Sequence, residues 1–196
     1  MPAPQRPYHH GNLSRSLLDA AAAVIDEVGP TQMSLREVAR RTGVSHAAPV
    51  HHFGDKRGLF TALAAEGFQM LDADLAATRN RTDDFAEIGV AYVMFALTHR
   101  AHFEVMFRPE LYDTASADVA AAAAAASDHL YGPSVAMFAP GTDRTDAGVF
   151  SWSLVHGLAT LIINGNLDGF GPDASPDPEA LARRITNLTR PAPKHH

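Results

Sequence analysis

Polar and basic residues on either side of a short turn form the part of this chain best suited to contact a polyanion. Ser45 and His46 follow Gly43, while Arg40 and Arg41 precede it. Hydroxyl and imidazole groups can exchange hydrogen bonds with base edges, and guanidinium groups pair well with phosphate oxygens. This combination of residue types suits contact with double-stranded DNA.

Three short helices between residues 34 and 60 are expected to position these side chains. Ser34 and Glu37 form an S-x-x-E capping box, which predicts that the first of these helices starts at Leu35. Gly43 follows the expected end of that helix, where a residue with positive φ is commonly needed.

The second helix is expected to start after a turn of three or four residues. Ser45 is a favourable N-cap, so this helix should begin at His46. Asp55 is likewise a favourable N-cap for a third helix that begins at Lys56. Two short helices joined by a turn that contains glycine are typical of the helix-turn-helix motif, whose second helix can enter the major groove.

This interpretation predicts which side chains would contact DNA. The predicted residues are Ser34, Arg36, Arg40, Arg41, Ser45, His46, Ala47, His51, His52 and Lys56. Base reading is assigned to Ser45, His46 and His51, because they lie on or near the exposed start of the second helix. Lys56 lies in the first turn of its helix, where backbone N–H groups also attract phosphate. An alternative is that residues 34–60 are three packed helices with no partner, which leaves the exposed polar and basic residues unexplained.

Residues 13–60 resemble the DNA-binding domain of the tetracycline-repressor (TetR/AcrR) family of transcriptional regulators. The matching residues are Leu18, Ala21, Ala22, Gly29, Ser34, Leu35, Val38, Ala39, Gly43, Val44, Ser45, His52, Phe53, Lys56 and Leu59. The family usually has Leu-Tyr where this chain has Pro49-Val50. Val50 cannot make the phosphate hydrogen bond of that Tyr, and Pro49 in a helix starting at His46 would crowd the carbonyl of Ser45. We interpret this departure as variation and not as loss of DNA binding.

The boundaries of the other helices are predicted from caps and breakers. Asn12 should cap a first helix that ends at Gly29-Pro30, and Lys56 should begin a long helix that ends near Thr78. Thr82 should cap the following helix. Ser175 is expected to cap the last helix, with Pro176 at its first position.

A helix predicted from about Asp143 to Asn166 is apolar nearly all round, so it should be buried on most sides. Its Trp152, His156 and Gly157 resemble the Trp-x-x-x-His-Gly pattern of the WHG type of C-terminal domain in the same family. A chain of this size has little room to bury this helix together with the last one, so both are expected to form a four-helix bundle in a twofold dimer. The predicted interface residues are Trp152, Gly157, Leu161, Leu181 and Ile185.

Aromatic, Leu and Met side chains in the C-terminal part are predicted to line a cavity for a small molecule. The candidates are Phe68, Leu71, Met94, Phe103, Met106, Phe107, Trp152 and His156. Methionine adapts to ligands of varied shape, and a largely apolar lining favours a hydrophobic or aromatic effector. The alternative is that these residues are plain core, and that His156 is a core histidine with its hydrogen bonds satisfied.

Composition and charge narrow the classes of protein that fit. The chain has 196 residues, is 46% hydrophobic and contains no cysteine, which indicates a globular protein without disulfides or thiolate metal sites. The net charge is −6, but residues 1–58 hold seven basic and five acidic residues, whereas residues 59–196 hold nine and seventeen. DNA is therefore expected to meet the N-terminal part.

No uninterrupted apolar run reaches the roughly 18 residues of a membrane helix, and no signal peptide is recognisable, so we expect a cytoplasmic protein without a membrane partner.

Enzymatic function is the competing class, and no motif supports it. The chain lacks G-x-S-x-G, P-loop, dinucleotide-binding and zinc motifs. His99, His102 and Glu104 form the nearest cluster, but a metal would need a third ligand on the face shared by the two histidines. We therefore expect no catalytic residue, no metal and no cofactor.

The sequence predicts an all-α protein of about nine helices. Residues 1–55 are expected to form a helix-turn-helix DNA-binding domain, and residues 56–196 a helical ligand-binding and dimerisation domain. The resemblance implies a repressor that binds a pseudo-palindromic operator as a homodimer and that a small hydrophobic or aromatic effector releases. The alternative function is a dimeric helical protein that binds small molecules without sequence-specific DNA binding.

Overall fold

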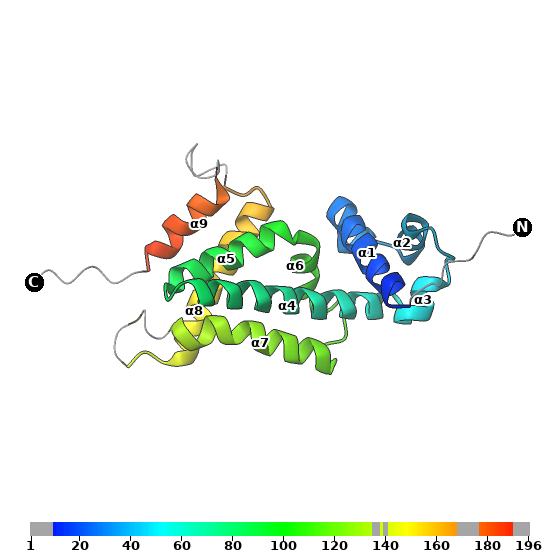
Figure 1. The fold of residues 1–196 in the computed structure, drawn as a ribbon. Helices are drawn as coiled ribbons and strands as arrows, with labels where there is room; N and C mark the ends of the chain where they lie inside the picture. Colours follow the sequence, from blue (N-terminus) through cyan, green and yellow to red (C-terminus); the bar gives the residue numbers. More distant parts are fainter. Residues whose placement is uncertain (1–9, 135–137, 139–140, 168–176, 190–196) are drawn as a thin grey trace, which may run out of the picture. The chain divides into compact units, whose positions relative to one another are not determined.

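A computed structural model describes residues 10–134, 138, 141–167 and 177–189, and their regular structure consists of helices without strands (Figure 1). This confirms the predicted all-α class. The helices are α1 (His10–Gln32), α2 (Leu35–Thr42), α3 (Ala48–Phe53), α4 (Lys56–Arg81), α5 (Phe85–Thr98), α6 (Arg100–Met106), α7 (Ala117–Ser134), α8 (Arg144–Ile163) and α9 (Pro178–Asn187).

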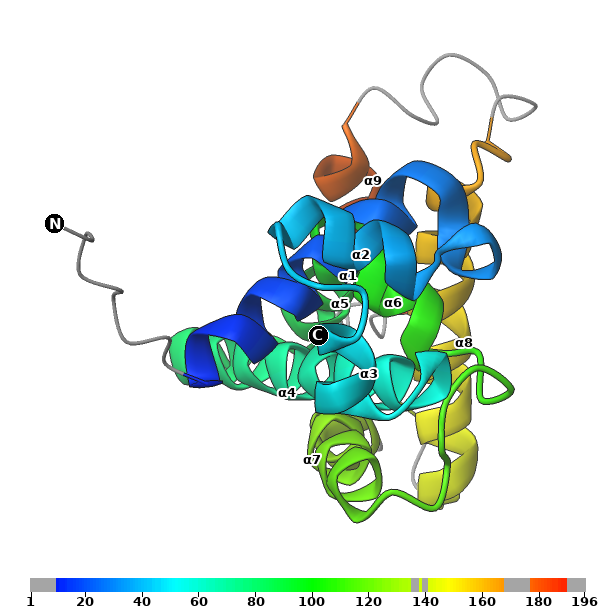
Figure 2. The same cartoon turned by 90° about the vertical axis from the view of Figure 1, so that its right-hand side faces the viewer.

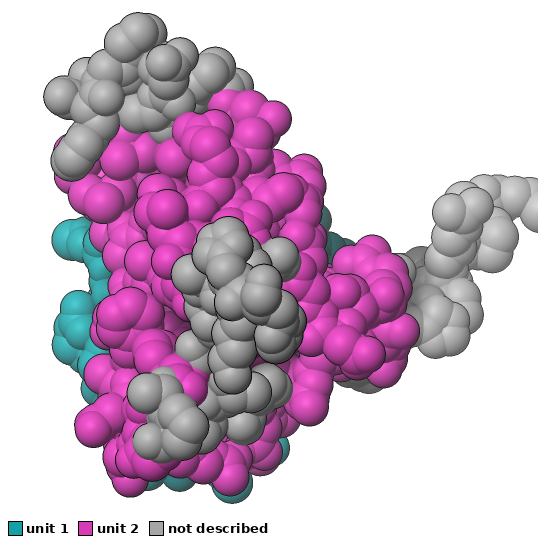
Figure 3. Space-filling view, turned by 90° about the vertical axis from the view of Figure 1, so that its left-hand side faces the viewer, with its two compact units in different colours: residues 1–65, 101–119 teal, residues 66–100, 120–196 magenta. Residues whose placement is uncertain are grey.

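The chain divides into two compact units, which Figure 3 colours separately. Unit 1 comprises residues 1–65 and 101–119, and unit 2 comprises residues 66–100 and 120–196. The helix α4 contributes residues to both units. Unit 1 also includes the segment around α6, which is distant in sequence from α1–α3. The predicted domain boundary after residue 55 stays a prediction.

Unit 1 is built on α1, α2 and α3, which lie together in both Figure 1 and Figure 2. The helix α1 starts at His10, two residues before the predicted cap Asn12. It buries Leu17 and Val24, which are 0% and 2% exposed. Gly29 has non-helical angles (φ 76°, ψ 163°) just before Pro30, so the predicted end of the helix is a kink.

Local capping explains where α2 begins and ends. The hydroxyl of Ser34 accepts a hydrogen bond from the backbone N–H of Glu37 at 3.2 Å, as the capping box predicts. Gly43 is left-handed, with φ of 68°, and Val44 donates from its backbone to the carbonyl of Ala39 at 3.1 Å. These contacts confirm both predicted ends of α2.

Two helix starts in unit 2 differ from the prediction. Asp84 caps α5 by accepting from the backbone N–H of Ala86 at 3.1 Å, whereas Thr82 accepts from the N–H of Asp84 at 3.0 Å. The prediction that Thr82 is the cap was therefore wrong. Asp177 caps α9, so the predicted start of that helix at Pro176 was also wrong. Ser175 and Pro176 lie outside the described residues.

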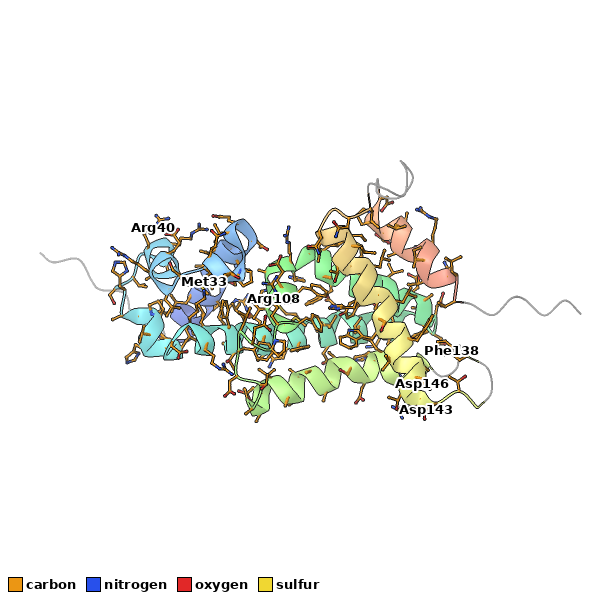
Figure 4. All side chains as sticks on the ribbon, turned by 180° about the vertical axis from the view of Figure 1, so that it is seen from behind. Met33, Arg40, Arg108, Phe138, Asp143 and Asp146 are labelled. Atoms are coloured by element: carbon orange, nitrogen blue, oxygen red, sulfur yellow. The ribbon has the colours of Figure 1, made fainter. Side chains whose placement is uncertain are left out.

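The helix α5 packs against α8 and α9 in unit 2. The approach is closest at Gly89, where an added Cβ atom would lie 2.8 Å from Cγ2 of Thr186. At the start of α8, Asp143 caps the helix through hydrogen bonds of 2.7 Å and 3.3 Å from the backbone N–H groups of Thr145 and Asp146. Figure 4 shows Asp143 and Asp146 at that end of α8.

The helix α8 is only partly buried within the single chain, and its predicted burial on most sides, which included a second copy, stays a prediction. Val149, Phe150 and Leu161 are 47%, 50% and 39% exposed. By length and composition alone α8 could span a membrane, with a mean hydropathy of 1.4 over its most apolar window. This is weak evidence for a membrane span, because a core or interface helix of a soluble protein meets the same test.

Candidate functional site

The turn between α2 and α3 is longer than the sequence predicted. The helix α3 begins at Ala48 and not at His46, and Ala47 in the capping position makes no side-chain capping hydrogen bond. The predicted role of Ser45 as the N-cap was therefore wrong. Ser45 instead accepts a backbone hydrogen bond from Ala48 at 3.0 Å. Ser45, His46 and Ala47 lie in the turn itself, and all three are exposed.

Pro49 accounts for the later start of α3. It occupies the first turn of the helix as observed, where its missing N–H is not needed. The expected clash with the carbonyl of Ser45 arises only if the helix starts at His46, so that prediction was wrong. Pro49 is buried, whereas its neighbour Val50 is 48% exposed.

The turn and α3 present one exposed surface. It comprises Ser45, His46, Ala47, Val50 and His51, which we call the reading surface. His52 is half-buried, and its ring centroid lies 5.7 Å from that of His51. The surface therefore combines hydroxyl and imidazole groups with two small apolar side chains. Val50 was predicted only as the loss of a phosphate contact, and its place on this surface was not predicted.

Arg41 joins α1 to α2 through carboxylates. Its Nη1 and Nη2 atoms donate to the two carboxylate oxygens of Glu27 at 2.7 Å and 2.6 Å, and its Nε donates to Glu37 at 2.9 Å. The side chain is 26% exposed. These hydrogen bonds raise the pKa of Arg41, so it remains a cation.

Arg40 shares one of these carboxylates. Its Nε and Nη2 atoms donate to Glu37 at 2.8 Å and 2.6 Å. Hydrogen bonds from Arg40 and then Arg41 lower the pKa of Glu37 to about 2. Figure 4 shows Arg40 on α2. Both arginines that were predicted to contact phosphate are thus already paired with acids, and their DNA contacts stay a prediction.

Other basic residues near the reading surface have different partners. Lys56 donates from Nζ to the carbonyl of Thr31 at 3.1 Å, and Nζ lies 5.3 Å from the ring centre of Phe60. Burial lowers the pKa of Lys56. Arg36 and Arg57 are exposed, and neither forms an ion pair with any described residue. Arg57, in the first turn of α4, was missed by the sequence analysis.

The start of α4 is held closely against the end of α3. Asp55 accepts from the backbone N–H of Gly58 at 2.8 Å, which confirms its predicted role as a cap. An added Cβ atom on Gly58 would lie 1.9 Å from the carbonyl oxygen of Phe53. Since real side chains do not approach so closely, only glycine fits here without movement of the backbone.

The residues predicted to line a ligand cavity fall into both units. Phe103, Met106 and Phe107 belong to unit 1, where the rings of Phe103 and Phe107 lie 5.0 Å apart. The remaining candidates, Phe68, Leu71, Met94, Trp152 and His156, belong to unit 2. Phe68 and Leu71 are 8% and 2% exposed. The role of all eight as ligand contacts stays a prediction.

Trp152 and His156 meet at one buried hydroxyl. Tyr92 on α5 is 0% exposed, and its hydroxyl lies 2.9 Å from Nδ1 of His156. The indole N–H of Trp152 donates to the same hydroxyl at 3.1 Å. Burial lowers the pKa of His156. These contacts show His156 as a hydrogen-bonded histidine between α5 and α8.

A cleft of about 410 Å³ opens in unit 2 between the end of α4, one face of α5 and the start of α9. Of the predicted ligand residues, only Met94 is among the residues that line it. Its other walls include Arg81 from α4, Glu87 from α5 and Arg183 from α9. These three residues were not predicted, because only the packing of three separate helices brings them together. A smaller hollow beside Phe150 measures about 20 Å³, room for roughly one water molecule.

The predicted dimer residues differ in burial within the single chain. Leu181 is 8% exposed and packs inside unit 2. Trp152, Gly157 and Ile185 are half-buried, and Leu161 is 39% exposed. An added Cβ atom on Gly157 would meet nothing within 4 Å. No described group of three His, Asp or Glu side chains could hold a metal ion.

Two family models match this helix-turn-helix arrangement and the helices that follow it. Residues 17–63 match the model of bacterial regulatory proteins of the tetR family. Residues 85–188 match the tetracyclin repressor-like C-terminal domain. The chain belongs to the TetR family. This confirms the resemblance on which the sequence analysis relied, and it indicates a regulatory protein and not an enzyme.

Curated relatives agree over a shorter part of the chain. The HTH-type transcriptional regulator BetI 2 of Chromohalobacter salexigens is 36% identical over 70 residues, which cover 36% of this chain and 34% of that protein. BetI of Serratia proteamaculans is 42% identical over 48 residues, 24% of each chain. The chain thus matches about a third or less of the length of these relatives.

Solved structures match nearly the whole TetR-family chain. A protein of unknown function from Rhodococcus sp. RHA1 is 32% identical, with a TM-score of 0.76 over 94% of this chain and 97% of that one. The TetR family regulator PfmR from Thermus thermophilus is 20% identical, with a TM-score of 0.65 over 88% of this chain and 96% of that one. The second likeness is one of fold alone.

Proposed function

We propose that this TetR-family protein is a transcriptional repressor that binds a pseudo-palindromic operator as a homodimer. The observation that carries the proposal is the reading surface, which is exposed on the turn and the second helix of a helix-turn-helix motif. Two such surfaces in a twofold dimer would dock into major grooves about 34–36 Å apart. A protein with this role works in the cytoplasm, where it has access to the chromosome.

The reading surface suits a mixed mode of base recognition. His46 and His51 can exchange hydrogen bonds with base edges, whereas Ala47 and Val50 can pack against thymine methyl groups. Arg36 and Arg57 are exposed cations close in sequence to the reading surface and form no ion pair with a described residue, so they would supply phosphate contacts. The apolar pair favours operators with thymine at the base pairs that it contacts.

Exposed apolar side chains on the last helices support the dimer. Val149, Phe150 and Leu161 on α8, and Leu188 just after α9 at 79% exposure, would leave their apolar side chains in water in a single chain. A second copy that packs its own α8 and α9 on this surface would bury them. This accounts for the apolar character of α8 without a membrane.

A small-molecule effector would release the operator by favouring one state of the dimer. Its effect on DNA affinity would equal its difference in affinity for the DNA-bound and unbound states. The helix α4 is the element best placed to connect ligand and DNA, because it begins at Lys56 in unit 1 and ends at Arg81 in unit 2.

Selection of bound duplexes from a random DNA pool, at two salt concentrations, tests the DNA-binding function. We expect a pseudo-palindrome whose affinity falls steeply as salt rises, because phosphate contacts release counterions. The variant H46A should alter the selected bases, whereas R57M should weaken binding to all sequences about equally. Recovery of no shared sequence would contradict the proposal and favour a dimeric small-molecule binder that does not read DNA.

A further inference from the structure

The cleft between α4, α5 and α9 in unit 2 has the volume and the apolar floor that are usual for a site that binds a small molecule. Its volume of about 410 Å³ lies within the roughly 300–1,000 Å³ that is usual for such sites. Val90 and Phe95 form a buried floor, at 4% and 2% exposure, and Met94 is half-buried beside them. An apolar body could therefore lie on α5.

The charges on the α5 and α9 walls already have partners. Arg183 donates from Nη1 to Glu87 and from Nη2 to Glu179, the latter at 2.8 Å. Hydrogen bonds from these two carboxylates raise the pKa of Arg183. One guanidinium between two carboxylates gives these three side chains a net charge of −1, so they would not hold a ligand anion.

The α4 wall carries the guanidinium of Arg81, which has no carboxylate partner among the described residues. Arg81 donates from Nη2 to the hydroxyl of Thr78 at 3.0 Å, and Thr78 is 4% exposed. No carboxylate of the described residues lies within 4 Å of the Arg81 nitrogen atoms. The buried hydroxyl thus orients the guanidinium, and most of its five N–H groups remain available for a bidentate carboxylate.

The opposite end of the α4 wall limits how much negative charge a ligand can carry. Asp74 lines the cleft two turns before Arg81, about 10 Å away along the helix axis. It is exposed and has no ion pair with a described residue. A second carboxylate lying toward Asp74, or toward the net negative α5 and α9 walls, would be repelled.

We propose that this cleft is the effector site and that it binds a small monocarboxylate with an apolar or aromatic body. The carboxylate pairs with Arg81, and the body lies over Met94 and Phe95. The regulatory part of this inference rests on the proposed function, whereas ligand binding to the cleft does not. The site differs from the cluster of eight residues predicted from the sequence, with which it shares Met94.

Calorimetric titration of the full chain with three probes that share the same apolar body tests which class of ligand the cleft binds. The probes are phenylbutyrate, phenylbutanol and phenylbutylamine, which differ only in the polar end group. We expect phenylbutyrate to bind at least about tenfold more tightly than the other two, as a charge-assisted hydrogen-bond pair implies. Equal or tighter binding of the amine, or no binding of any probe at millimolar concentration, would overturn the proposal.

Two substitutions on α4 distinguish a direct contact between Arg81 and the carboxylate from a general effect of removing one positive charge. Arg81→Met should remove the preference for phenylbutyrate, at a cost of about tenfold or more in affinity. Arg79→Met removes the same charge from an exposed residue that does not line the cleft, so it should leave the preference intact. Met94→Trp should weaken all three probes by filling the floor. An unchanged affinity for phenylbutyrate in Arg81→Met would overturn the assignment.

Operator binding with saturating phenylbutyrate tests the regulatory part. The probe should lower the DNA affinity of the wild type and leave that of Arg81→Met unchanged. Unchanged DNA affinity in the wild type would overturn the cleft as effector site while leaving the DNA-binding function intact. A wild type that binds no operator would instead refute the proposed function, and calorimetry would still decide whether the cleft binds carboxylates.

Discussion

The hydroxyl group of Tyr92 lies 2.9 Å from Nδ1 of His156, across the interface between α5 and α8. The indole N–H of Trp152 can only donate, so the Tyr92 oxygen accepts from it. Trp152 and His156 are four residues apart, which places both on the face of α8 that meets Tyr92.

Tyr92→Phe should lower the free energy of unfolding by about 1–3 kcal/mol, because it removes a hydrogen-bond partner that two half-buried polar groups share. Urea unfolding followed by circular dichroism measures this change. A double-mutant cycle with His156→Gln should show that the two effects are not additive. Additive effects would mean that the hydrogen bond between Tyr92 and His156 contributes little to stability.

Acid should destabilise unit 2 through His156. Burial lowers its pKa in the folded chain from the ordinary value of 6.5, so the unfolded state binds more protons between the two pKa values. Stability from this group is complete above about pH 6.5 and is lost as the pH falls toward the folded pKa. The loss on going from about pH 7.5 to pH 5.5 should be smaller in His156→Gln than in the wild type. An equal loss in both proteins would assign the effect to the other histidines.

Interactions between neighbouring residues were readable from the sequence, and those that depend on packing were not. The caps at Ser34 and Asp55 were predicted because each uses a backbone N–H three residues away. The start of α3 was misplaced, because Ser45 was read as a cap while Pro49 was placed too late in the first turn. The start of α5 was misplaced for a similar reason. Thr82 and Asp84 are both favourable N-caps, and only the structure shows that Asp84 accepts from the backbone N–H of Ala86.

The candidate sites show the same contrast between local interactions, which the sequence predicts, and contacts between separate helices, which it does not. The reading surface was largely predicted, because its residues are close in sequence. The pairing of Arg41 with Glu27 joins two helices, and no sequence pattern indicates that these side chains meet. The cleft requires α9 to pack beside α4 and α5, which brings Arg183 to Glu87. The expected ligand residues were chosen for type and spacing, which cannot distinguish a packed core from an open cleft.

Release of the paired arginines should strengthen DNA binding. Glu37→Gln removes the carboxylate that Arg40 and Arg41 share, so at least one guanidinium becomes available to phosphate. We expect a higher affinity for operator and non-operator DNA, and a salt dependence steeper by about one unit per arginine released. Fluorescence anisotropy at several salt concentrations measures both quantities.

Asp26→Asn is the matched control for Glu37→Gln. Asp26 is exposed and has no ion pair among the described residues, so its loss changes the net charge by the same amount without freeing an arginine. Its effect on DNA affinity should be smaller and its salt dependence close to that of the wild type. If the two variants behave alike, the pairing of Arg40 and Arg41 does not limit DNA binding.

Gly58→Ala should disturb the junction between α3 and α4. Its Cβ atom would lie 1.9 Å from the carbonyl oxygen of Phe53, so one of the two backbones must move. We expect a loss of roughly 1–3 kcal/mol in the free energy of unfolding, as for other overpacked sites, and weaker operator binding. Thermal unfolding and anisotropy measure the two effects. A variant as stable as the wild type would show that this turn adjusts without cost.

Gly157→Leu should separate folding of the chain from its dimerisation. A Cβ atom on Gly157 meets nothing within 4 Å in the single chain, so the larger side chain can be accommodated there. In the proposed dimer the same position faces a second copy of α8, and a leucine would prevent close approach of the helices. Light scattering after size-exclusion chromatography should show a folded monomer with weak operator binding. Ala125→Leu, which adds the same side chain at an exposed site on α7, should remain dimeric. A dimeric Gly157→Leu protein would mean that α8 does not pair closely at this residue.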